Sequence, residues 1–589
     1  MTEVAGRLRA LKSEIADGMR IDWDVPIQMD DGVVLRADVY RPVDDGRYPV
    51  LITYGPYAKN LPFEQGYAGF WKQVVADDPA VTEGTTGKYV GFEVPDPEKW
   101  VRDGYAIVRV DSRGAGRSPG RVENFSEREV RDYHDCIEWA GTQEWSSGKV
   151  GTTGTSYFGM MSWYVANLRP PHLAGMYLSE AAVDYYRDSA RHGGILNRFT
   201  KHWFASQVQS VQHGLGKRGH VNPFNGMLIS GDEELSDEAL RENVGMDPFV
   251  AITERPLAPD KYYQTRTAKL DQMQVPFVSV GSWGALSIHL RGNVEGFVGA
   301  AAEKKYLSVV NGSGYVYFHS EAGREHQRRF FDHVLKGEGD LGQEPRVRLE
   351  VRHVDGTSHL RGEDAWPLPA TQWQKLYLDP GAQTLGAGPP AGEVTATYRG
   401  FEEGITFRTE PFTEATEIVG PVAAKLFLSS STTDADVFAV LRLFAPDGSE
   451  VLFRGQPDPK SPLSQGWLRA SHRKLDAARS QVWRPFHAHD EEQPLTPGEV
   501  YELDVEIWPT SIVVPEGYTL ALTIQGKDFD HGLEPAVLPM QNEPIVMRGS
   551  GHFLHDVESD RPAGVFDGEV TLHAGGDRAA YLLLPVIPH

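Results

Sequence analysis

The fold of this chain is decided by one short stretch of sequence, GTTGTSYFG at residues 151–159. A strand-like approach at residues 148–150 precedes it, and an apolar helical run, MMSWYVA at residues 160–166, follows it. Small residues therefore flank one serine, Ser156, where a strand meets a helix. Such a turn can lift a hydroxyl above a sheet and aim it at the positive end of the next helix. The spacing is G-x-S-x-x-G rather than the common G-x-S-x-G, and an ordinary strand-to-helix connection would show similar small residues.

On the N-terminal side of the serine turn, strand-like and helix-like segments alternate. A hairpin turn at residues 30–32 joins two alternating strands, and residues 48–54 and 105–110 are apolar runs typical of buried strands. A helix is expected at about residues 127–142. This alternation predicts a mostly parallel sheet with helices on both faces, which is an α/β architecture.

The remaining chain divides into an insertion and a separate β-rich region. From about residue 184 to 270 the strand signals fade and the sequence favours helices, so this segment is interpreted as an inserted helical cap. Strands then resume, and the α/β core is expected to comprise residues 1–183 and 271–365. After about residue 365, short strands alternate with Pro, Gly and Asp turns without intervening helices. That pattern predicts a β-sandwich of jelly-roll type over residues 366–589.

The length and charge of the chain limit its class. Its 589 residues are too many for one hydrophobic core. The net charge of −24 disfavours a nucleic acid or an anionic membrane as partner, because no basic stripe could replace counterions. The sequence has no run of about 18 apolar residues and no signal-peptide core, so we expect a cytoplasmic protein with no membrane partner. The sequence leaves open whether copies associate as a homo-oligomer through the C-terminal region.

No cofactor or metal site is expected. Cys136 is the only cysteine, which excludes an intrachain disulfide, and its helical context predicts a buried thiol. His487 and His489 lie two residues apart, which suits neither a helical ligand pair nor a zinc finger, so a polar loop is favoured. Asp434 and Asp436 have no further ligands in register and are interpreted as a solvated turn.

Several motifs in a fixed order carry a family resemblance. With the serine turn they are GPYAK at residues 55–59, DSRGAGRSPG at 111–120, WSSGKVG at 145–151, GWLRASHR at 466–473 and DVEIWPTS at 504–511. Together they resemble the cocaine-esterase-like hydrolases, the CocE/NonD group, which are related to X-Pro dipeptidyl-peptidases. The resemblance spans essentially the whole chain. It implies an α/β-hydrolase core with a helical cap and a C-terminal jelly roll.

The resemblance also implies an activity and assigns residues to it. The group hydrolyses esters or amides through an acyl-serine, so the expected partner is a small-molecule ester or amide. Ser156 corresponds to the nucleophile. The backbone N–H of Tyr157 and the hydroxyl of Tyr57 correspond to the two donors of the oxyanion hole. Two fixed donors make chemical sense, because the tetrahedral intermediate carries a full charge on one oxygen and one donor can contribute about 3–4 kcal/mol.

The base and the acid of the expected triad are not at their family positions. The family aspartate follows a tryptophan after a sheet strand, and the matching text, GSWGALSIH at residues 281–289, has no carboxylate near Ala285. The family histidine falls on or near Gly314, in NGSGYVYFHS at residues 311–320. Glycine has no side chain that could accept a proton.

Two interpretations follow from these gaps. In the first, His319 serves as the base from a shifted register, because a loop can absorb five residues, and His289 is the second candidate. The orienting acid would be Glu295, Glu321 or no residue at all. In the second interpretation the triad is degenerate, and the chain is a non-hydrolytic enzyme or a ligand-binding protein.

The expected pocket is rich in aromatic residues, which indicates a substrate with an apolar or aromatic portion. The side chains expected to line it are Trp283, Tyr315, Tyr317, Phe318, Phe158, Trp163, Trp203 and Phe204.

Overall fold

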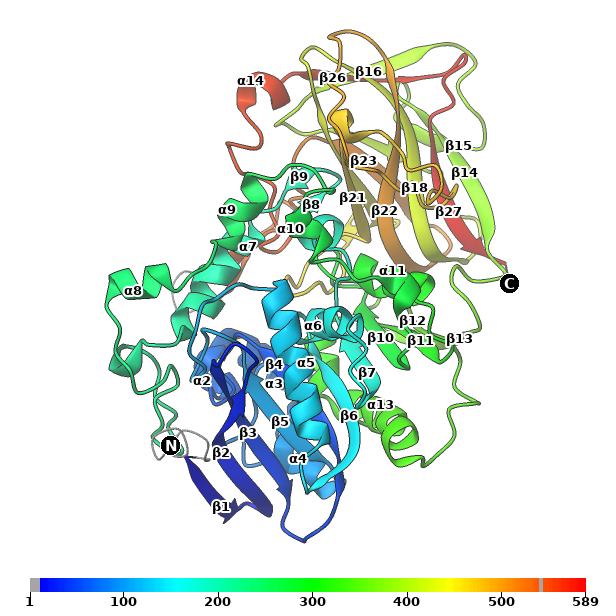
Figure 1. Cartoon of the computed structure of the whole chain (residues 1–589). Coiled ribbons are helices and arrows are strands. Elements are labelled where there is room, and N and C mark those ends of the chain that lie inside the picture. Colours follow the sequence, from blue (N-terminus) through cyan, green and yellow to red (C-terminus); the bar gives the residue numbers. More distant parts are fainter. Residues whose placement is uncertain (1–10, 540–543, 589) are drawn as a thin grey trace.

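The structure is a computed structural model that describes residues 11–539 and 544–588. Its N-terminal part is built around a mixed sheet flanked by helices, and its C-terminal part is a β-domain (Figure 1). The α/β core and the C-terminal β-domain predicted from the sequence are both confirmed.

The first sheet has the strand order β1-β2-β3-β5-β4-β6-β7-β10-β11-β12-β13. The pairings from β5 to β12 along this order are parallel, and the remaining pairings are antiparallel. The central strands are almost continuously buried, as expected for parallel strands covered on both faces. The strands are β1 (Lys12–Ala16), β2 (Met19–Gln28), β3 (Val34–Pro42), β4 (Tyr48–Gly55), β5 (Ala106–Asp111), β6 (Ser146–Thr155), β7 (Leu173–Ser179), β10 (Phe277–Ser282), β11 (Lys305–Val310), β12 (Val347–Arg352) and β13 (Ser358–Glu363).

Helices cover both faces of this sheet. Neighbouring residues of β5 belong to different hydrophobic clusters, Val108 to the cluster that contains α5 and α6 and Ile107 to the cluster that contains α4 and α13. Because successive side chains of a strand point to opposite faces, the two helix groups lie on opposite sides. The helices of this part are α2 (Phe63–Gly66), α3 (Ala68–Asp77), α4 (Pro97–Arg102), α5 (Glu127–Gly141), α6 (Tyr157–Ala166), α11 (Leu290–Gly299), α12 (Gly314–His319) and α13 (Glu321–Phe331).

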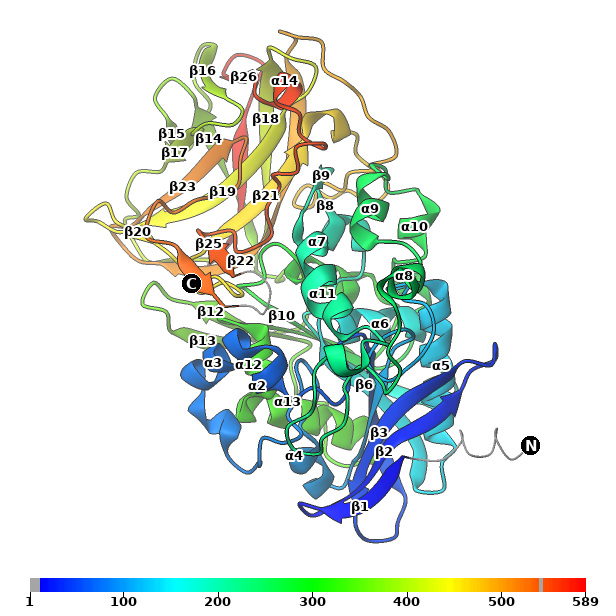
Figure 2. The same cartoon turned by 90° about the vertical axis from the view of Figure 1, so that its left-hand side faces the viewer.

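A largely helical segment connects β7 to β10 and lies beside the carboxyl ends of the sheet strands (Figures 1 and 2). Its short helices begin at capping residues, for example Ser236, whose side chain accepts from the Ala239 N–H at the start of α8. Its elements are β8 (Arg191–His192), β9 (Ile195–Leu196), α7 (Phe199–Trp203), α8 (Asp237–Glu242), α9 (Pro248–Thr253) and α10 (Lys261–Gln264).

The C-terminal domain is built on a second sheet that folds back on itself. β27 pairs with β14 and also with β18, so the strands between them form a closed ring (Figure 2). A separate hairpin, β24 (Ala536–Leu538) and β25 (Ile545–Met547), lies outside this sheet. The remaining elements are β14 (Gln372–Asp379), β15 (Thr384–Gly386), β16 (Val394–Arg399), β17 (Ile405–Arg408), β18 (Thr416–Ser430), β19 (Asp436–Phe444), β20 (Glu450–Val451), β21 (Ser464–Arg469), β22 (Tyr501–Val514), β23 (Thr519–Gln525), α14 (Ala563–Phe566), β26 (Glu569–Ala574) and β27 (Tyr581–Ile587).

The sequence expectations for isolated polar residues have mixed outcomes. Cys136 is buried within α5, as predicted. The solvated turn expected at Asp436 is wrong, because this residue is 3% exposed in β19 and accepts charge-assisted hydrogen bonds from Arg469 and Arg561, both at 2.8 Å. His487 lies outside the helices and strands, but it is buried rather than solvated.

Two further observations concern the described part of the chain as a whole. None of its helices is long and apolar enough to cross a membrane. Its His, Cys, Asp and Glu side chains form no group of three or more that could hold a metal ion.

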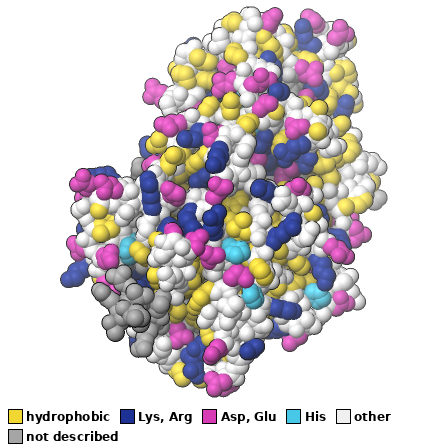
Figure 3. Space-filling model, viewed as in Figure 1, with side chains coloured by type: hydrophobic (Ala, Val, Ile, Leu, Met, Phe, Trp, Pro, Cys, Tyr) yellow, Lys and Arg dark blue, Asp and Glu magenta, His cyan; other side chains and the backbone are white. Residues whose placement is uncertain are grey.

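Acidic and basic side chains are interspersed across the face shown in Figure 3.

A buried ion cluster joins the N-terminal hairpin to the carboxyl edge of the sheet. The Lys59 Nζ lies 3.3 Å from Asp24 Oδ1, 3.3 Å from Asp38 Oδ1 and 3.5 Å from Asp111 Oδ2. Arg117 adds a second cation, with its Nε 3.1 Å from Asp24 Oδ1. These carboxylates come from β2, β3 and β5, so the cluster fixes three strands against the loop after β4.

Removing the central cation of this cluster should be strongly destabilising. We expect Lys59→Met to lower the free energy of unfolding by about 3–5 kcal/mol, because it leaves buried carboxylates without their partner. The control is Lys88→Met, which removes the partly exposed pair with Asp17 and should lower it by less than about 1 kcal/mol. Urea denaturation of both variants measures the difference, and equal effects would contradict the prediction.

Candidate active site

Ser156 lies in a strained turn between β6 and α6. Its backbone has φ 57° and ψ −113°, the left-handed region that non-glycine residues rarely adopt. Two hydrogen bonds hold this turn: the Ser156 N–H donates to Ser179 O at 3.0 Å, and the Thr155 N–H donates to Glu93 O at 3.0 Å. Ser156 is the N-cap of α6, but its side chain makes no capping bond. The Oγ atom is therefore free of the helix.

The small residues of the turn are explained by close contacts. A Cβ atom at Gly154 would lie 2.5 Å from Phe158 Cβ, and one at Gly159 would lie 2.8 Å from Ala181 Cβ. Gly159 therefore lets the start of α6 approach the loop after β7. This contact accounts for the last glycine of the G-x-S-x-x-G spacing.

Backbone strain is concentrated around this turn. Glu93 (φ 62°) and Glu180 (φ 45°) also have left-handed backbones, and each lies at or next to a carbonyl that holds the turn. Ala58 (φ 63°) follows Tyr57, and Phe125 (φ 59°) stacks on Tyr157 at 4.2 Å. Each such residue costs about 1–3 kcal/mol and persists where the surroundings fix it, which is frequent at functional sites.

His289 is the histidine that contacts the serine. Its Nε2 lies 3.1 Å from Ser156 Oγ. It occupies the N-cap position of α11, in the loop after β10, and is 3% exposed. Burial lowers the pKa of His289 to about 3, so the imidazole is neutral at pH 7. Its Nδ1 has no hydrogen-bond partner within the described residues.

His319 lies elsewhere, and the geometry does not support its expected role as the base. It is the last residue of α12 and packs against Phe63, with ring centroids 5.4 Å apart, in a cavity that does not include Ser156. The sequence predicts a loop at residues 311–320, but most of this segment is helical. Five residues on a helix turn through about 500°, so His319 does not share the direction of Gly314.

Neither carboxylate proposed as the orienting acid contacts His289. Glu295 accepts from Arg484 at 3.0 Å, and Glu321 accepts from Arg324 at 2.7 Å. Sequence reasoning missed Glu180 altogether. A Cβ at Gly314 would lie 2.3 Å from Glu180 Oε1, so this carboxyl occupies the space where a side chain at Gly314 would begin.

Glu180 is held by a residue of the C-terminal domain. The Gln456 Nε2 donates to Glu180 Oε2, and Gln456 Oε1 accepts from the Gly314 N–H at 2.9 Å. The Gln456 N–H donates to Gly284 O at 3.0 Å. Through its side-chain amide and its backbone N–H, Gln456 thus connects the loops after β7, β10 and β11. Burial raises the pKa of Glu180 to about 8, so its carboxyl is largely protonated at pH 7.

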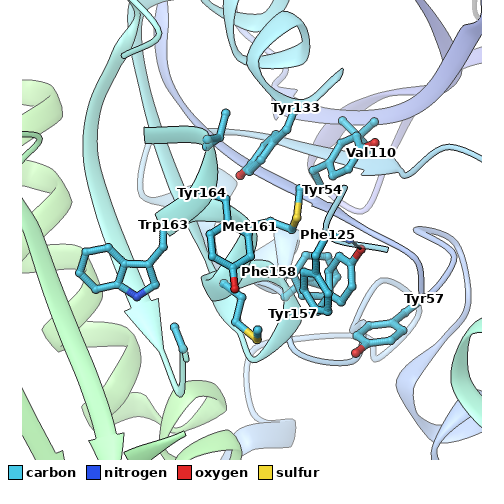
Figure 4. Packing of buried hydrophobic residues seen from close by; sticks show 14 of the residues in the cluster. Tyr54, Tyr57, Val110, Phe125, Tyr133, Tyr157, Phe158, Met161, Trp163 and Tyr164 are labelled. Carbon is cyan, nitrogen blue, oxygen red and sulfur yellow. Dashed lines mark hydrogen bonds between the residues drawn. The ribbon is translucent and has the colours of Figure 1, made fainter. Parts of the chain in front are cut away.

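The two expected oxyanion donors lie beside the serine. The Tyr57 hydroxyl accepts from Trp203 Nε1 at 2.9 Å, which uses a lone pair and leaves the phenol hydrogen able to donate. Tyr157 is the first residue of α6, where N–H groups lack an intrahelical partner. The Tyr157 hydroxyl donates to Glu129 Oε2 at 2.5 Å, which fixes its ring. Figure 4 shows Tyr57 at the edge of the cluster, beside Tyr157 and Phe125.

Ser156 and His289 line a cavity between the sheet and the inserted helical segment. Of the aromatic residues expected to line it, Trp203 does, whereas Trp163 and Trp283 are core residues and Phe158 faces another cavity. The lining is nevertheless largely aromatic or apolar, because the inserted segment supplies further rings. It consists of Tyr57, Phe125, Ser156, Tyr157, Met160, Tyr185, Ser189, Phe199, Thr200, Trp203, Ile288 and His289.

Two family models match the chain. The model of the X-Pro dipeptidyl-peptidase S15 family matches residues 31–313, and the model of the X-Pro dipeptidyl-peptidase C-terminal non-catalytic domain matches residues 340–552. A cocaine esterase from Rhodococcus sp. (strain MB1 Bresler) is 25% identical over 86% of this chain and 90% of that protein.

Solved structures of other proteins superpose on nearly the whole of this chain. A CocE/NonD family hydrolase from Staphylococcus aureus superposes with a TM-score of 0.82 at 28% identity, covering 98% of this chain and 97% of that chain. An α-amino acid ester hydrolase shares the fold, with a TM-score of 0.68 at 18% identity over 97% of this chain and 98% of that chain.

A mixed sheet with a strained serine turn at the carboxyl end of a central strand defines an α/β-hydrolase. The two matched families and the whole-chain superposition then place it within that class. The chain belongs to the CocE/NonD family of serine hydrolases, which is related to the X-Pro dipeptidyl-peptidases.

The strained backbone at Ser156 predicts an unusual order of stability. We expect Ser156→Gly to be more stable to unfolding than Ser156→Ala by about 1 kcal/mol, because glycine adopts positive φ without a steric penalty. The buried helical Ser162 is the matched control, where glycine should be less stable than alanine by a similar amount. Chemical denaturation of the four variants tests this, and the same order at both positions would contradict it.

Proposed function

We propose that the chain hydrolyses an ester of a small molecule through an acyl-serine at Ser156, with His289 as the general base. The observation that carries the proposal is the 3.1 Å separation of His289 Nε2 and Ser156 Oγ at the strained turn. A nucleophile needs a base within hydrogen-bond reach, and this pair meets that requirement. The relative named cocaine esterase supports an ester rather than an amide as the bond that is cleaved.

The proposed steps follow from the positions of the donors and acceptors. The Ser156 hydroxyl gives its proton to His289 Nε2 as Oγ attacks the carbonyl carbon. The oxyanion receives hydrogen bonds from the Tyr57 hydroxyl and the Tyr157 N–H. His289 then donates the proton to the leaving alcohol, and a water molecule reverses the sequence to release the acid.

The apolar and aromatic lining of the Ser156 cavity supports a substrate with an apolar or aromatic portion. Phe125, Tyr185 and Trp203 present ring surfaces to this cavity. Such surfaces favour burial of an apolar group by the hydrophobic effect.

A second candidate function is favoured by His289 Nδ1, which has no hydrogen-bond partner among residues 11–539 and 544–588. Without an acid at that atom, the imidazolium formed during catalysis lacks the partner that stabilises it in a complete triad. A chain with such an incomplete triad could serve as a ligand-binding protein or a non-hydrolytic enzyme. A ligand of the Ser156 cavity would then raise the melting temperature without being converted.

Labelling with a fluorophosphonate probe tests the serine and its base. We expect the chain to be labelled at pH 7, Ser156→Ala to be unlabelled, and His289→Gln to react at least about 100-fold more slowly. His319→Gln is the matched control, since it alters a buried histidine in another cavity and should leave the rate unchanged. No labelling of the native chain would favour the second candidate function, and a loss in His319→Gln alone would restore His319 as the base.

The low pKa of His289 gives a distinct pH profile. The base is active when deprotonated, so the labelling rate should stay nearly constant from pH 7 to about pH 5 and fall only as the pH approaches the pKa of about 3. A fall in the labelling rate near pH 6.5, the ordinary pKa of histidine, would show that another group acts as the base.

Folding must be followed in parallel. Folded His289 binds its proton at lower pH than the unfolded chain does, so stability falls as the pH drops from about 6.5 toward 3. Circular dichroism at each pH separates unfolding from protonation of the base.

A further inference from the structure

A second cavity adjoins the Ser156 pocket. It shares Tyr57 with that pocket. Leu61, Phe92 and Phe158 give it a largely apolar lining, and Arg109 also lines it. We call it the inner cavity. Figure 4 shows Tyr57 and Phe158, two of its walls, among the buried aromatic residues of the core.

Arg109 is a buried cation without a direct counter-ion. It lies in the middle of β5 and is 3% exposed. Within residues 11–539 and 544–588 its one recorded hydrogen bond runs from Nη2 to the carbonyl of Pro95, and it forms no ion pair. Its Nε has no hydrogen-bond partner in this part of the chain. The aromatic ring of Tyr40 lies 5.7 Å away, which supplies a weak cation–π contact.

The neighbouring acids do not neutralise Arg109 by contact. Asp38 and Asp96 act on it through space, without an ion pair in the described residues. Asp38 already binds Lys59 at 3.3 Å. Burial raises the pKa of Glu93, on the adjoining loop, well above its usual value, which favours the neutral form of its carboxyl. By contrast, Lys59, the other cation of the lining, has three carboxylates around its ammonium group.

The backbone beside Arg109 is shaped to leave room for its guanidinium. A Cβ at Gly91 would lie 3.1 Å from Arg109 Nη1 and 2.7 Å from Val94 Cγ2. Glycine at this position therefore keeps one side of the guanidinium free of a side chain, in a segment that also lines the inner cavity.

We propose that the inner cavity binds a carboxylate carried on a short apolar chain, with Arg109 as the counter-ion. An unpaired buried charge is strongly unfavourable, and a planar guanidinium matches a carboxylate with paired charge-assisted hydrogen bonds. The apolar walls provide the contact surface for the chain of the ligand. An anion of high charge, such as a phosphate, fits less well, because the cavity offers one free cation among its described residues. Binding does not require the chemistry proposed for Ser156.

The two sources of such a carboxylate are a free carboxylic acid and an arm of a larger substrate. Both present the same group to Arg109. Because Tyr57 borders both cavities, an arm entering the inner cavity would leave the rest of a substrate near Ser156.

Calorimetric titration with hexanoate tests the proposal, with hexanamide as the neutral probe of similar shape. We expect hexanoate to bind the native chain at one site and hexanamide to bind far more weakly. Arg109→Met should weaken hexanoate binding by about 30-fold or more, as expected when one partner of a buried charge pair is removed. Arg109→Lys keeps the charge but lacks the planar guanidinium, so its affinity for hexanoate should lie between those of the native chain and Arg109→Met.

The matched control is Arg352→Met. Arg352 is also a buried arginine with no ion pair among the described residues, but its donors are used by Ser511 O and Thr510 Oγ1, at 2.8 and 3.0 Å. We expect this variant to bind hexanoate like the native chain. Neither methionine variant leaves a buried carboxylate without a contacting cation among the described residues, so both should stay folded, and thermal denaturation checks this.

Three results would overturn the proposal: no binding of hexanoate at millimolar concentration, equal binding of hexanamide, or unchanged binding in folded Arg109→Met. If hexanoate binds through Arg109 and competes with ester substrates, the site takes a substrate arm. If it binds through Arg109 without competing, the site takes a free carboxylate. Fluorophosphonate labelling reports on Ser156 separately, so the failure of one proposal leaves the other measurable.

Discussion

The left-handed backbone of Ser156 is the constraint on which the architecture of the site depends. A serine does not adopt φ 57° unless its neighbours hold it there. The carbonyl of Ser179 does so from the adjacent strand, and the carbonyl of Glu93 does so from the loop before α4. The sheet register, the glycine contacts of α6 and the two strained glutamates all serve this turn. Backbone hydrogen bonds from neighbouring segments, and not a single side chain, therefore hold the strained conformation of Ser156.

The same constraint explains why a histidine can reach the serine from an unexpected loop. Once Oγ is exposed at the carboxyl edge of the sheet, any loop that ends nearby can bring an imidazole to it. Here the loop after β10 supplies His289, while Glu180 occupies the space beside Gly314. The result is a serine–histidine pair in a dry environment, whose imidazole has no acid at Nδ1 in the described residues.

The sequence predicts the fold well because its signals are local and repeated. The serine turn, the hairpin at residues 30–32 and the buried apolar strands each define one element, and their order defines the sheet. The serine turn itself is a local signal for Ser156, whereas Tyr57 is pointed out only by the family resemblance; both residues line the same cavity. The sequence favours His319 because it predicts a loop over residues 311–320, whereas Gly314–His319 form α12 and the histidine that contacts Ser156 is His289. No local sequence pattern indicates the position of Glu180 or of the inner cavity, because both depend on packing between residues that lie far apart in the sequence.

Gln456 has a consequence for how such a chain can evolve. It belongs to the C-terminal β-domain, yet its side-chain amide contacts Glu180 and Gly314 and its backbone N–H contacts Gly284, in loops that follow three strands of the first sheet. The β-domain therefore helps to hold loops at the carboxyl edge of that sheet. A recombination event that exchanged the β-domain for an unrelated module would remove these contacts together with the module. A substitution in either half must be compatible with the other half, which favours inheritance of the two halves together.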